Sequence, residues 1–295
     1  MSTLPRLSLF AAPGSSAVDR RAADWLSACG IDARPVQAPA LEGLQGGSWE
    51  LDAPESALSA LRALLQEETT EDLSALLTPA AMLGSRRTLV VTDVDSTLIQ
   101  EEVIELLAAH AGREAEVAAV TERAMRGELD FAASLHHRVQ ALKGLPVRVI
   151  AEVAEQVTPM PGALDLIAAA HANGHRVGAV SGGFIQVLEP LAQALGLDHA
   201  QANELGVRDG VLTGTVEGPV VDRAAKAAAL RRWCAADDIK ATHTVALGDG
   251  ANDLDLLTIA GYAVGVRPKP ALRNACDGVL GVRRLDTVSA ALGWS

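Results

Sequence analysis

Thr88-Leu-Val-Val-Thr-Asp93-Val-Asp95-Ser-Thr97 is a short run of apolar and β-branched residues that ends in two aspartates, one residue apart. The run predicts a short buried strand over 88–92. In an open α/β sheet, ligands bind beyond the carboxyl ends of the strands, so a site is expected directly after it. One carboxylate could act as a nucleophile and the other as an acid or base, and both offer oxygen ligands to a hard cation. A simple Asx turn is the alternative, and this motif by itself does not decide between them.

A second motif, Leu247-Gly-Asp249-Gly-Ala-Asn252-Asp253, follows another apolar run that predicts a strand over 242–247. Its glycines allow the backbone to approach a ligand closely. A carboxylate at a helix start is often a simple cap, which would account for Asp249 or Asp253 taken singly. Three polar groups converging with two glycines are more than a cap explains, and they favour a functional site.

Two weaker signals lie between these motifs. Val-Ser181-Gly182-Gly-Phe ends a third predicted strand, over 176–180, where a hydroxyl and free N–H groups could bind an anion. A capping serine at a strand-to-helix turn is the simpler interpretation of that stretch alone. Lys226 lies early in a predicted helix over 223–237, where a lysine is usually a solvated surface charge.

Strands alternate with helices over the second half of the chain, which predicts an α/β protein with a mostly parallel sheet covered on both faces. From residue 100 to about 157 the pattern is almost wholly helical, with breaks at Gly112, Gly127 and 144–146. These breaks predict a four-helix insertion. A hairpin is expected around 207–221.

The first 85 residues form a separate pattern. Their periodicity and turn residues predict a strand over 7–12, a helix over 17–29, strands over 33–38 and 47–52 and a helix over 55–67. A last short apolar segment covers 72–77. A domain boundary is expected near 80–87, which divides the chain into 1–85 and 86–295.

Composition narrows the class of partner. The 295 residues carry 37 acidic and 25 basic side chains, a net charge of −12, which argues against nucleic acid and against an anionic membrane surface. The three cysteines, Cys29, Cys234 and Cys276, are far apart and are expected to be reduced thiols. No apolar run approaches the ~20 residues of a membrane span, and the N-terminus has no signal-peptide layout, so a cytoplasmic protein is expected.

Taken in order, the DxD, Ser, Lys and GDGxND motifs resemble those of the haloacid dehalogenase-type phosphatases, over residues 88–285. The resemblance implies a Rossmann-like core (86–99 and 158–295) with a helical-bundle cap inserted at about 100–157. It implies that Asp93 is the nucleophile, forming an aspartyl-phosphate, and that Asp95 is the general acid and base.

The same resemblance implies the cofactor and the phosphate ligands. Mg²⁺ would be held by Asp93, the backbone carbonyl of Asp95 and Asp249, with support from Asp253. Phosphoryl oxygens would be held by Ser181, Gly182, Gly183 and Lys226.

A narrower likeness is to the phosphoserine phosphatase family. It rests on the Glu that follows DxDST and on Met125-Arg-Gly-Glu-Leu-Asp-Phe131 and Ser134-Leu-His-His-Arg138-Val. The likeness implies that Glu102 binds the substrate ammonium and Arg138 its carboxylate, with Met125 and Phe131 as an apolar lid and Gly182 and Asn252 nearby. Without the surrounding motifs, Glu102 and Arg138 would be interpreted as ordinary solvated charges.

The implied reaction is hydrolysis of O-phospho-L-serine to L-serine and phosphate, the last step of serine biosynthesis. Alternatives are a phosphatase for phosphothreonine or phosphohomoserine, and a non-catalytic amino-acid sensor. The βαββαβ order at the N-terminus resembles the small amino-acid-binding ACT domains, which implies a possible homodimer and serine sensing. The alternative for this module is an extension that packs on the catalytic domain.

Overall fold

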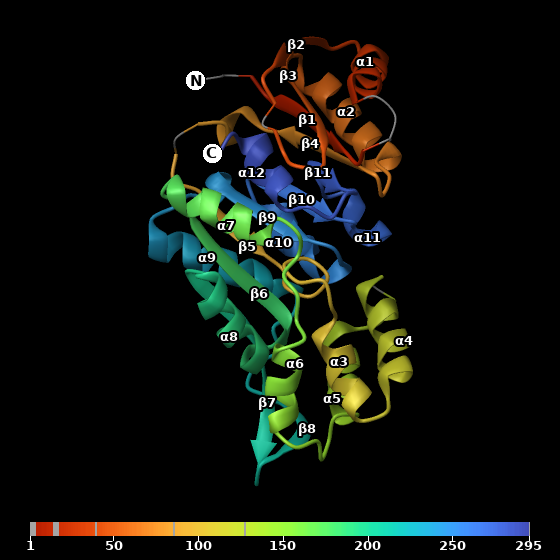
Figure 1. Ribbon diagram of the computed structural model, residues 1–295, viewed down its shortest axis with the longest axis vertical. Helices are drawn as coiled ribbons and strands as arrows, with labels where there is room; N and C mark the ends of the chain where they lie inside the picture. Colours follow the sequence, from red (N-terminus) through yellow and green to blue (C-terminus); the bar gives the residue numbers. More distant parts are fainter. Residues whose placement is uncertain (1–3, 14–17, 39, 85, 127, 295) are drawn as a thin grey trace.

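One continuous β-sheet runs through the whole molecule (Figure 1). The computed structural model describes residues 4–13, 18–38, 40–84, 86–126 and 128–294, except for the side chain of Met125. Within that part of the chain the sheet has eleven strands, in the order β2-β3-β1-β4-β11-β10-β9-β5-β6-β7-β8. Both predicted regions of the protein therefore share a single sheet.

The central strands are parallel, as the sequence predicts. β5 (Leu89–Thr92) pairs in parallel with β6 (Arg176–Phe184) and β9 (Thr244–Gly248). β10 (Tyr262–Val266) and β11 (Gly278–Leu280) continue the parallel arrangement beyond β9. These strands are almost completely buried because helices cover both faces.

The side chains of β5 alternate between two hydrophobic clusters, one on each face of the sheet. Val90 packs in the cluster that contains residues of α7, α8 and α12, whereas Leu89 and Val91 pack in the cluster of α9, α10 and α11. The bounds of these helices are α7 (Ala163–Ala172), α8 (Ile185–Leu195), α9 (Arg223–Asp237), α10 (Leu254–Ile259), α11 (Pro270–Arg273) and α12 (Asp286–Leu292). The α/β fold class is confirmed.

Four helices form the cap between β5 and α7, within the predicted interval 100–157. They are α3 (Val103–His110), α4 (Glu114–Met125), α5 (Phe131–Gln140) and α6 (Arg148–Ala154). The Asp130 side chain starts α5 by accepting the Ala133 N–H at 2.8 Å. Leu107, Leu135 and Val153 are fully buried between the helices, which explains why this polar insertion still folds as a unit.

Two predicted boundaries are wrong. The expected hairpin starts too late, because β7 (His199–Arg208) already pairs in parallel with β6 before it turns into β8 (Val211–Glu217). β6 runs to Phe184 instead of ending at Val180, through a register shift between these two residues. Both errors come from polar and glycine-rich sequence that lacks the usual strand alternation.

Short 3-10 turns complete the elements: η1 (Ala80–Met82), η2 (Ala241–His243) and η3 (Ala251–Asp253).

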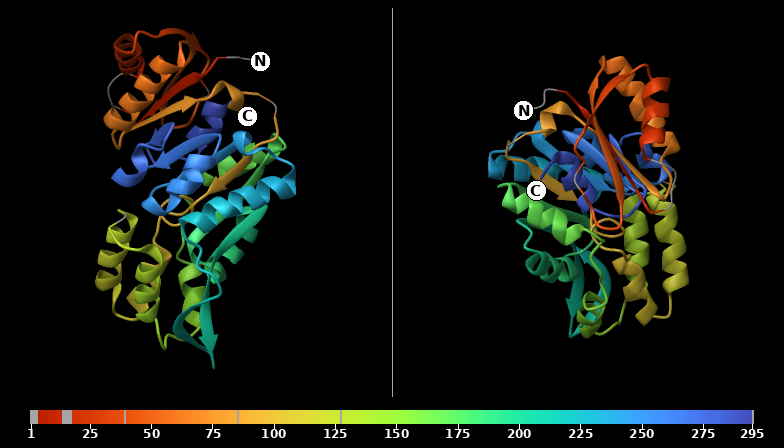
Figure 2. Two further views of the ribbon diagram at one scale, coloured as in Figure 1. Left: turned by 180° about the vertical axis from the view of Figure 1, so that it is seen from behind. Right: turned by 45° about the horizontal axis from the view of Figure 1, so that its top comes forward.

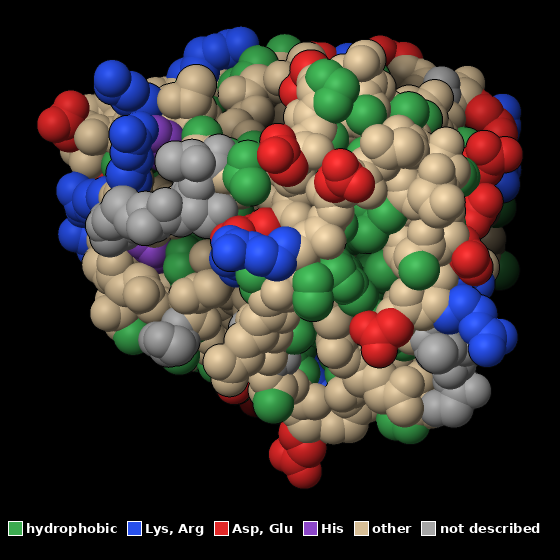
Figure 3. All heavy atoms as spheres, turned by 90° about the horizontal axis from the view of Figure 1, so that it is seen from above, with side chains coloured by type: hydrophobic (Ala, Val, Ile, Leu, Met, Phe, Trp, Pro, Cys, Tyr) green, Lys and Arg blue, Asp and Glu red, His purple; other side chains and the backbone are tan. Residues whose placement is uncertain are grey.

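The N-terminal module has the predicted βαββαβ order. Its elements are β1 (Arg6–Ala11), α1 (Val18–Ala28), β2 (Asp32–Val36), β3 (Gln45–Asp52), α2 (Glu55–Glu68) and β4 (Leu73–Thr78). β1 lies between β3 and β4, antiparallel to both, and β2 forms the outer edge. The two helices and the sheet enclose a hydrophobic cluster of their own. Seen from this end of the molecule, acidic, basic and apolar side chains are interspersed (Figure 3).

The module is joined to the core through side-by-side strands. β4 pairs antiparallel with β11, with Leu76 opposite Gly278. Across the same junction Arg62 Nε donates to Asp277 Oδ1 at 2.8 Å, and the Thr78 and Tyr262 hydroxyls lie 3.2 Å apart. The module and the cap lie at opposite ends of the molecule (Figure 2). No helix among the described residues is both long enough and apolar enough to cross a membrane.

Candidate active site

The candidate site lies at the carboxyl ends of β5, β6 and β9. Asp93 follows β5 directly, and its N–H donates to the Leu247 carbonyl of β9 at 2.9 Å. Asp249 follows β9, and Ser181 lies near the end of β6. Parallel neighbouring strands place these three side chains at one edge of the sheet, which explains how motifs about 150 residues apart meet.

Three buried carboxylates surround one buried lysine below the site. Oxygens of Asp93, Asp249 and Asp253 lie within 4.8 Å of one another. Lys226 Nζ donates to Asp93 Oδ1 and to Asp253 Oδ1, both at 2.6 Å. Lys226 is 0% exposed, so the interpretation of this residue as a solvated surface charge is wrong. Its position follows from the start of α9, where the Asp222 side chain accepts the Ala225 N–H.

The charges of this cluster do not balance. Burial, together with repulsion from Asp253, raises the pKa of Asp93 to about 8, although Lys226 acts in the opposite direction. Burial also raises the pKa of Asp249 well above its usual value, and Asp253 adds to the effect. Burial by itself would lower the pKa of Lys226, but attraction to Asp253 and Asp93 raises it overall. The cluster therefore has more negative charge than one lysine neutralises.

The donor set of the cluster fits a hard divalent cation. Asp249 Oδ1 is buried and has no hydrogen-bond partner among the described residues. Asp253 differs, because its Oδ2 accepts the N–H groups of Asp249 and Gly250 at 3.1 and 3.2 Å while its Oδ1 accepts from Lys226. Carboxylate oxygens are the ligands such cations prefer. Asp93 and Asp249 are thus suited to contact a cation, and Asp253 to orient the loop and the lysine.

The Asp95 side chain turns away from this cluster, toward the cap. Its Oδ1 accepts the Val103 N–H at 2.8 Å and its Oδ2 accepts from the Ser181 hydroxyl at 3.0 Å. The Asp95 carboxylate is therefore not a member of the acidic cluster; the ligand predicted from this residue is its backbone carbonyl. Burial raises the pKa of Asp95, although its hydrogen bonds with Val103 and Ser181 act in the opposite direction.

Two glycines are required where β6 enters the site. A Cβ on Gly182 would lie 2.6 Å from Phe131 Cζ, and a Cβ on Gly183 would lie 2.8 Å from Asp95 Oδ2. The Gly183 N–H donates to Ser181 Oγ at 2.7 Å. The Gly182 carbonyl accepts from the buried Asn203 side chain at 2.8 Å. These contacts bring the β6 backbone directly against the cap and explain the Ser-Gly-Gly sequence.

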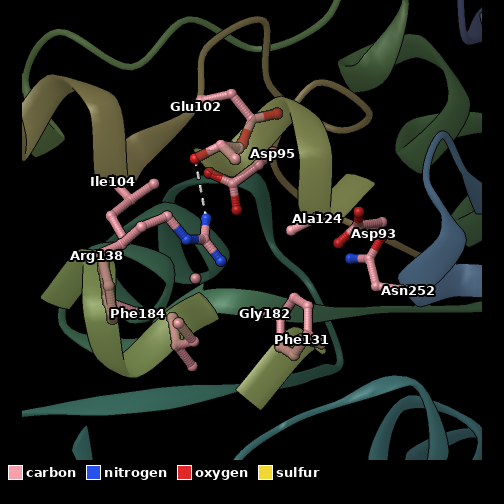
Figure 4. Close-up of a pocket in the computed structure, with 13 residues that line it drawn as sticks. Asp93, Asp95, Glu102, Ile104, Ala124, Phe131, Arg138, Gly182, Phe184 and Asn252 are labelled. Atoms are coloured by element: carbon pink, nitrogen blue, oxygen red, sulfur yellow. Dashed lines mark hydrogen bonds between the residues drawn. The ribbon is translucent and has the colours of Figure 1, made fainter. Parts of the chain in front are cut away.

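A narrow cavity lies between the core and the cap (Figure 4). It is lined by Asp93, Asp95, Glu102, Ile104, Thr121, Ala124, Phe131, Leu135, Arg138, Gly182, Gly183, Phe184 and Asn252. In Figure 4, Arg138 extends into the cavity from one side, while Asp93 and Asn252 lie on the other. Asp93 and Asn252 of the core thus share one cavity with Phe131 and Arg138 of the cap.

Arg138 and Glu102 place a guanidinium and a carboxyl group at the cap side of this cavity. Arg138 is 6% exposed, and it donates to Thr121 Oγ1 at 3.0 Å and to the Ser134 carbonyl at 3.2 Å. Glu102 precedes α3 and accepts from the Ser96 hydroxyl at 2.7 Å. Burial, with repulsion from Asp95, raises the pKa of Glu102 to about 8, whereas burial lowers the pKa of Arg138. Arg138 is therefore not a solvated surface charge, whereas Glu102 is partly exposed at the cavity.

Several of the residues that line the cavity do not belong to any of the sequence motifs. Thr121, Ile104 and Leu135 were not singled out in the sequence, although helical spacing could have found two of them. Thr121 lies four residues before Met125 in α4, and Leu135 lies four residues after Phe131 in α5. Met125 ends α4, and its predicted role as a lid stays a prediction because its side chain lies outside the described part of the chain.

The comparison with protein families matches this architecture. The haloacid dehalogenase-like hydrolase family matches residues 90–258, which span the nucleophile motif, the cap and the acidic cluster. The chain therefore belongs to the haloacid dehalogenase-like hydrolases.

Individual relatives narrow the class. A phosphoserine phosphatase of Mycobacterium tuberculosis is 49% identical over 231 residues, which cover 78% of this chain and 56% of that protein. One from Streptococcus thermophilus is 48% identical over 185 residues, covering 63% of this chain and 86% of that protein. A solved phospho-aspartyl intermediate analogue of a phosphoserine phosphatase is 39% identical, with a TM-score of 0.67 over 69% of this chain and 97% of that one. These relatives are phosphoserine phosphatases, and the chain spans just over half the length of the mycobacterial protein.

Proposed function

We propose that this chain hydrolyses O-phospho-L-serine to L-serine and phosphate, with Mg²⁺ as cofactor. The observation that carries the proposal is the shared cavity, with Asp93 on one side and the Glu102–Arg138 charges on the other. A phosphoserine molecule has a phosphate, an ammonium and a carboxylate, and these residues complement all three. The named relatives are phosphoserine phosphatases, which supports the same substrate.

The first chemical step uses both aspartates of the DxD motif. A carboxylate oxygen of Asp93 attacks phosphorus and forms a P–O bond, while the bond from phosphorus to the serine oxygen breaks. Asp95 donates a proton to that leaving oxygen. L-Serine leaves, and the phosphoryl group remains on Asp93. A related solved structure is an analogue of this kind of intermediate.

In the second step water replaces the aspartyl group. Asp95, now a carboxylate, takes a proton from a water molecule whose oxygen attacks phosphorus. The P–O bond to Asp93 breaks, so phosphate is released and the Asp93 carboxylate is restored.

The buried cluster and the residues beside it indicate which groups would hold the cation and which would hold the phosphate. Asp93, Asp249 and the Asp95 carbonyl would hold Mg²⁺, which when bound offsets the repulsion between the Asp93 carboxylate and the phosphate. Lys226, Ser181 and the N–H groups of Gly182 and Gly183 would hold the phosphoryl oxygens. Lys226 already contacts the nucleophile at 2.6 Å, so it is placed for this role.

For the N-terminal module we propose an ACT-like role, with homodimer formation and serine sensing. Support comes from its βαββαβ order and from β2, which is an exposed edge strand of the described sheet. Light scattering with and without L-serine tests the module, because the proposal expects a dimer and a response to serine.

The proposed location is the cytoplasm. A reaction that ends serine biosynthesis, together with three free cysteines, favours this location.

Phosphate release from O-phospho-L-serine, with Mg²⁺ and with EDTA, tests the proposed reaction. Release that is abolished by EDTA and restored by excess Mg²⁺ is the expected result. Release that continues unchanged in EDTA would contradict the metal assignment. An absence of release under both conditions, with a folded protein, would favour the amino-acid sensor.

A further inference from the structure

The turn that carries the general acid has an unusual backbone. Ser96, between Asp95 and Thr97, has a φ of 56°, in the left-handed region that non-glycine residues rarely adopt. Such a conformation costs of the order of 1 kcal/mol or more and persists where surrounding contacts hold it. The contacts around Ser96 therefore decide where the neighbouring Asp95 is placed.

Three contacts hold Ser96, one at each of its polar groups. Its N–H donates to the Glu101 carbonyl at 3.2 Å, and its hydroxyl donates to Glu102 Oε1 at 2.7 Å. Its carbonyl accepts from Arg283 Nη2 at 2.9 Å. The first two partners belong to the same turn as Ser96. Arg283 comes from 187 residues away and is the long-range contact among these three.

Arg283 is itself fixed by the junction with the N-terminal module. It follows β11 in a segment whose Gly281 N–H donates to the Leu73 carbonyl and whose Val282 carbonyl accepts from Ser74 Oγ, both at 3.1 Å. Leu73 and Ser74 both belong to β4 of the N-terminal module. The guanidinium therefore reaches the turn from a segment anchored on β4.

The positive charge of Arg283 is compatible with its position beside the acidic site. Burial and repulsion from Arg267 lower the pKa of Arg283, although the acidic groups Asp249, Glu101 and Glu102 act in the opposite direction. An arginine guanidinium nevertheless stays cationic in proteins. Its Nε is buried and has no hydrogen-bond partner among the described residues. A buried donor left unpaired is costly, so a purely structural role would favour a neutral or apolar side chain here.

We propose that Arg283 is a positioning residue for the phosphatase reaction: by holding the Ser96 carbonyl, it fixes the left-handed turn that presents Asp95 and Glu102 to the substrate. The inference rests on the proposed function and deepens it. Arg283 does not line the cavity, so its effect on the reaction passes through the turn. Because its segment is anchored on β4, the N-terminal module supports the turn through the same residue.

Arg283→Met tests the inference, with two substrates. Phosphoserine has an alkoxide leaving group that needs a proton from Asp95 and an ammonium that needs Glu102. p-Nitrophenyl phosphate has a good leaving group and no ammonium. We expect kcat/KM to fall by about 10- to 100-fold for phosphoserine, the range for a slightly displaced catalytic group, and by less than about threefold for p-nitrophenyl phosphate. Arg283→Lys, which restores one donor, is expected to recover part of the loss.

Arg284→Met is the matched control. Arg284 donates to the Glu42 carbonyl at 3.1 Å and to Asp286 Oδ1 at 3.0 Å. It has no recorded contact with the turn, so this variant should lose stability but keep its kcat/KM for both substrates. Equal losses for the two substrates in Arg283→Met, or the same phosphoserine loss in Arg284→Met, would overturn the inference, because general destabilisation would then explain the result.

A double-mutant cycle with Ser96→Gly locates the effect. Glycine adopts a positive φ without the steric penalty, so the turn in Ser96→Gly depends less on Arg283. The loss caused by Arg283→Met should therefore be clearly smaller in the Ser96→Gly background. Equal losses in both backgrounds would overturn the inference. A wild-type protein that does not hydrolyse phosphoserine would instead refute the proposed function, so the two failures are distinguishable.

Discussion

The two sides of the cavity are built in different ways. On the phosphate side, Asp93, Asp249 and Ser181 stand at the ends of parallel strands, and Lys226 is fully buried among carboxylates. On the cap side, Arg138 projects from a short helix and Glu102 from a turn before another. Under the proposed function, the residues that react with the phosphate lie on the sheet, whereas the residues that select the substrate lie on an inserted element. Substitutions on the phosphate side should therefore impair turnover, whereas substitutions on the cap side should impair recognition of the substrate.

Asp93→Asn should have the largest effect. It removes the nucleophile but keeps the shape of the side chain, so kcat should fall by about 10⁴-fold or more for every phosphate ester, while phosphate binding remains measurable. Steady-state kinetics and a phosphate-binding titration provide the readout. Asp165→Asn, an exposed aspartate of α7, serves as the control and should behave as wild type. Unchanged turnover in Asp93→Asn would remove the nucleophile assignment.

Lys226→Met should damage both stability and activity. Removing one partner of a buried ion pair leaves Asp93 and Asp253 uncompensated, which costs about 3 to 5 kcal/mol of unfolding free energy. Urea unfolding, with phosphatase assays on the folded fraction, measures the two effects. Lys240→Met alters an exposed lysine and should change neither. A Lys226→Met protein as stable as wild type would show that the buried cluster is not held as described.

Arg138→Met should impair recognition without impairing the chemistry. Loss of a charge-assisted contact with the substrate carboxylate should raise KM for phosphoserine by roughly 10- to 100-fold. Kinetics with p-nitrophenyl phosphate, which lacks the carboxylate, should change little. The control is Arg148→Met, a cap arginine whose side chain is 74% exposed. If both substrates suffer equally in Arg138→Met, the division of roles between the two sides of the cavity is incorrect.

Glu102 should give the smallest effect, visible in the pH profile. With a pKa of about 8, this carboxyl is mostly neutral at pH 7 and becomes anionic as the pH rises. An anion binds the substrate ammonium better, so kcat/KM for phosphoserine should rise by about fivefold between pH 7 and pH 8. In Glu102→Gln that part of the rise should disappear, leaving the titration of the other groups. Superimposable profiles for the two proteins would contradict the role of Glu102.

The sequence predicts the phosphate side better than the cap side, for a physical reason. Asp93 and Asp249 follow apolar strands, and strand ends of a parallel sheet necessarily meet at one edge. The burial of Lys226 and Arg138 could not be predicted in this way, because it depends on how α9 and α5 pack. The family resemblance, and not the local pattern, selected these two residues.

Other features depend on tertiary contacts that no local pattern carries. The pairing of β4 with β11 joins segments about 200 residues apart, so the predicted boundary near 80–87 gave no sign of a continuous sheet. The contact of Arg283 with Ser96 has the same origin. The left-handed backbone of Ser96 also departs from residue preference, since glycine or asparagine would be expected at that position.

The most direct test of the central claim is kcat/KM of the wild-type protein for O-phospho-L-serine, phosphothreonine, phosphohomoserine and p-nitrophenyl phosphate, measured with Mg²⁺. The account predicts that phosphoserine is the best substrate of the four. p-Nitrophenyl phosphate lacks the ammonium and carboxylate that Glu102 and Arg138 complement, and the other two esters carry one more carbon than phosphoserine in the same cavity. A higher kcat/KM for phosphothreonine or phosphohomoserine would contradict the proposed substrate, and a higher kcat/KM for p-nitrophenyl phosphate would contradict the roles of Glu102 and Arg138.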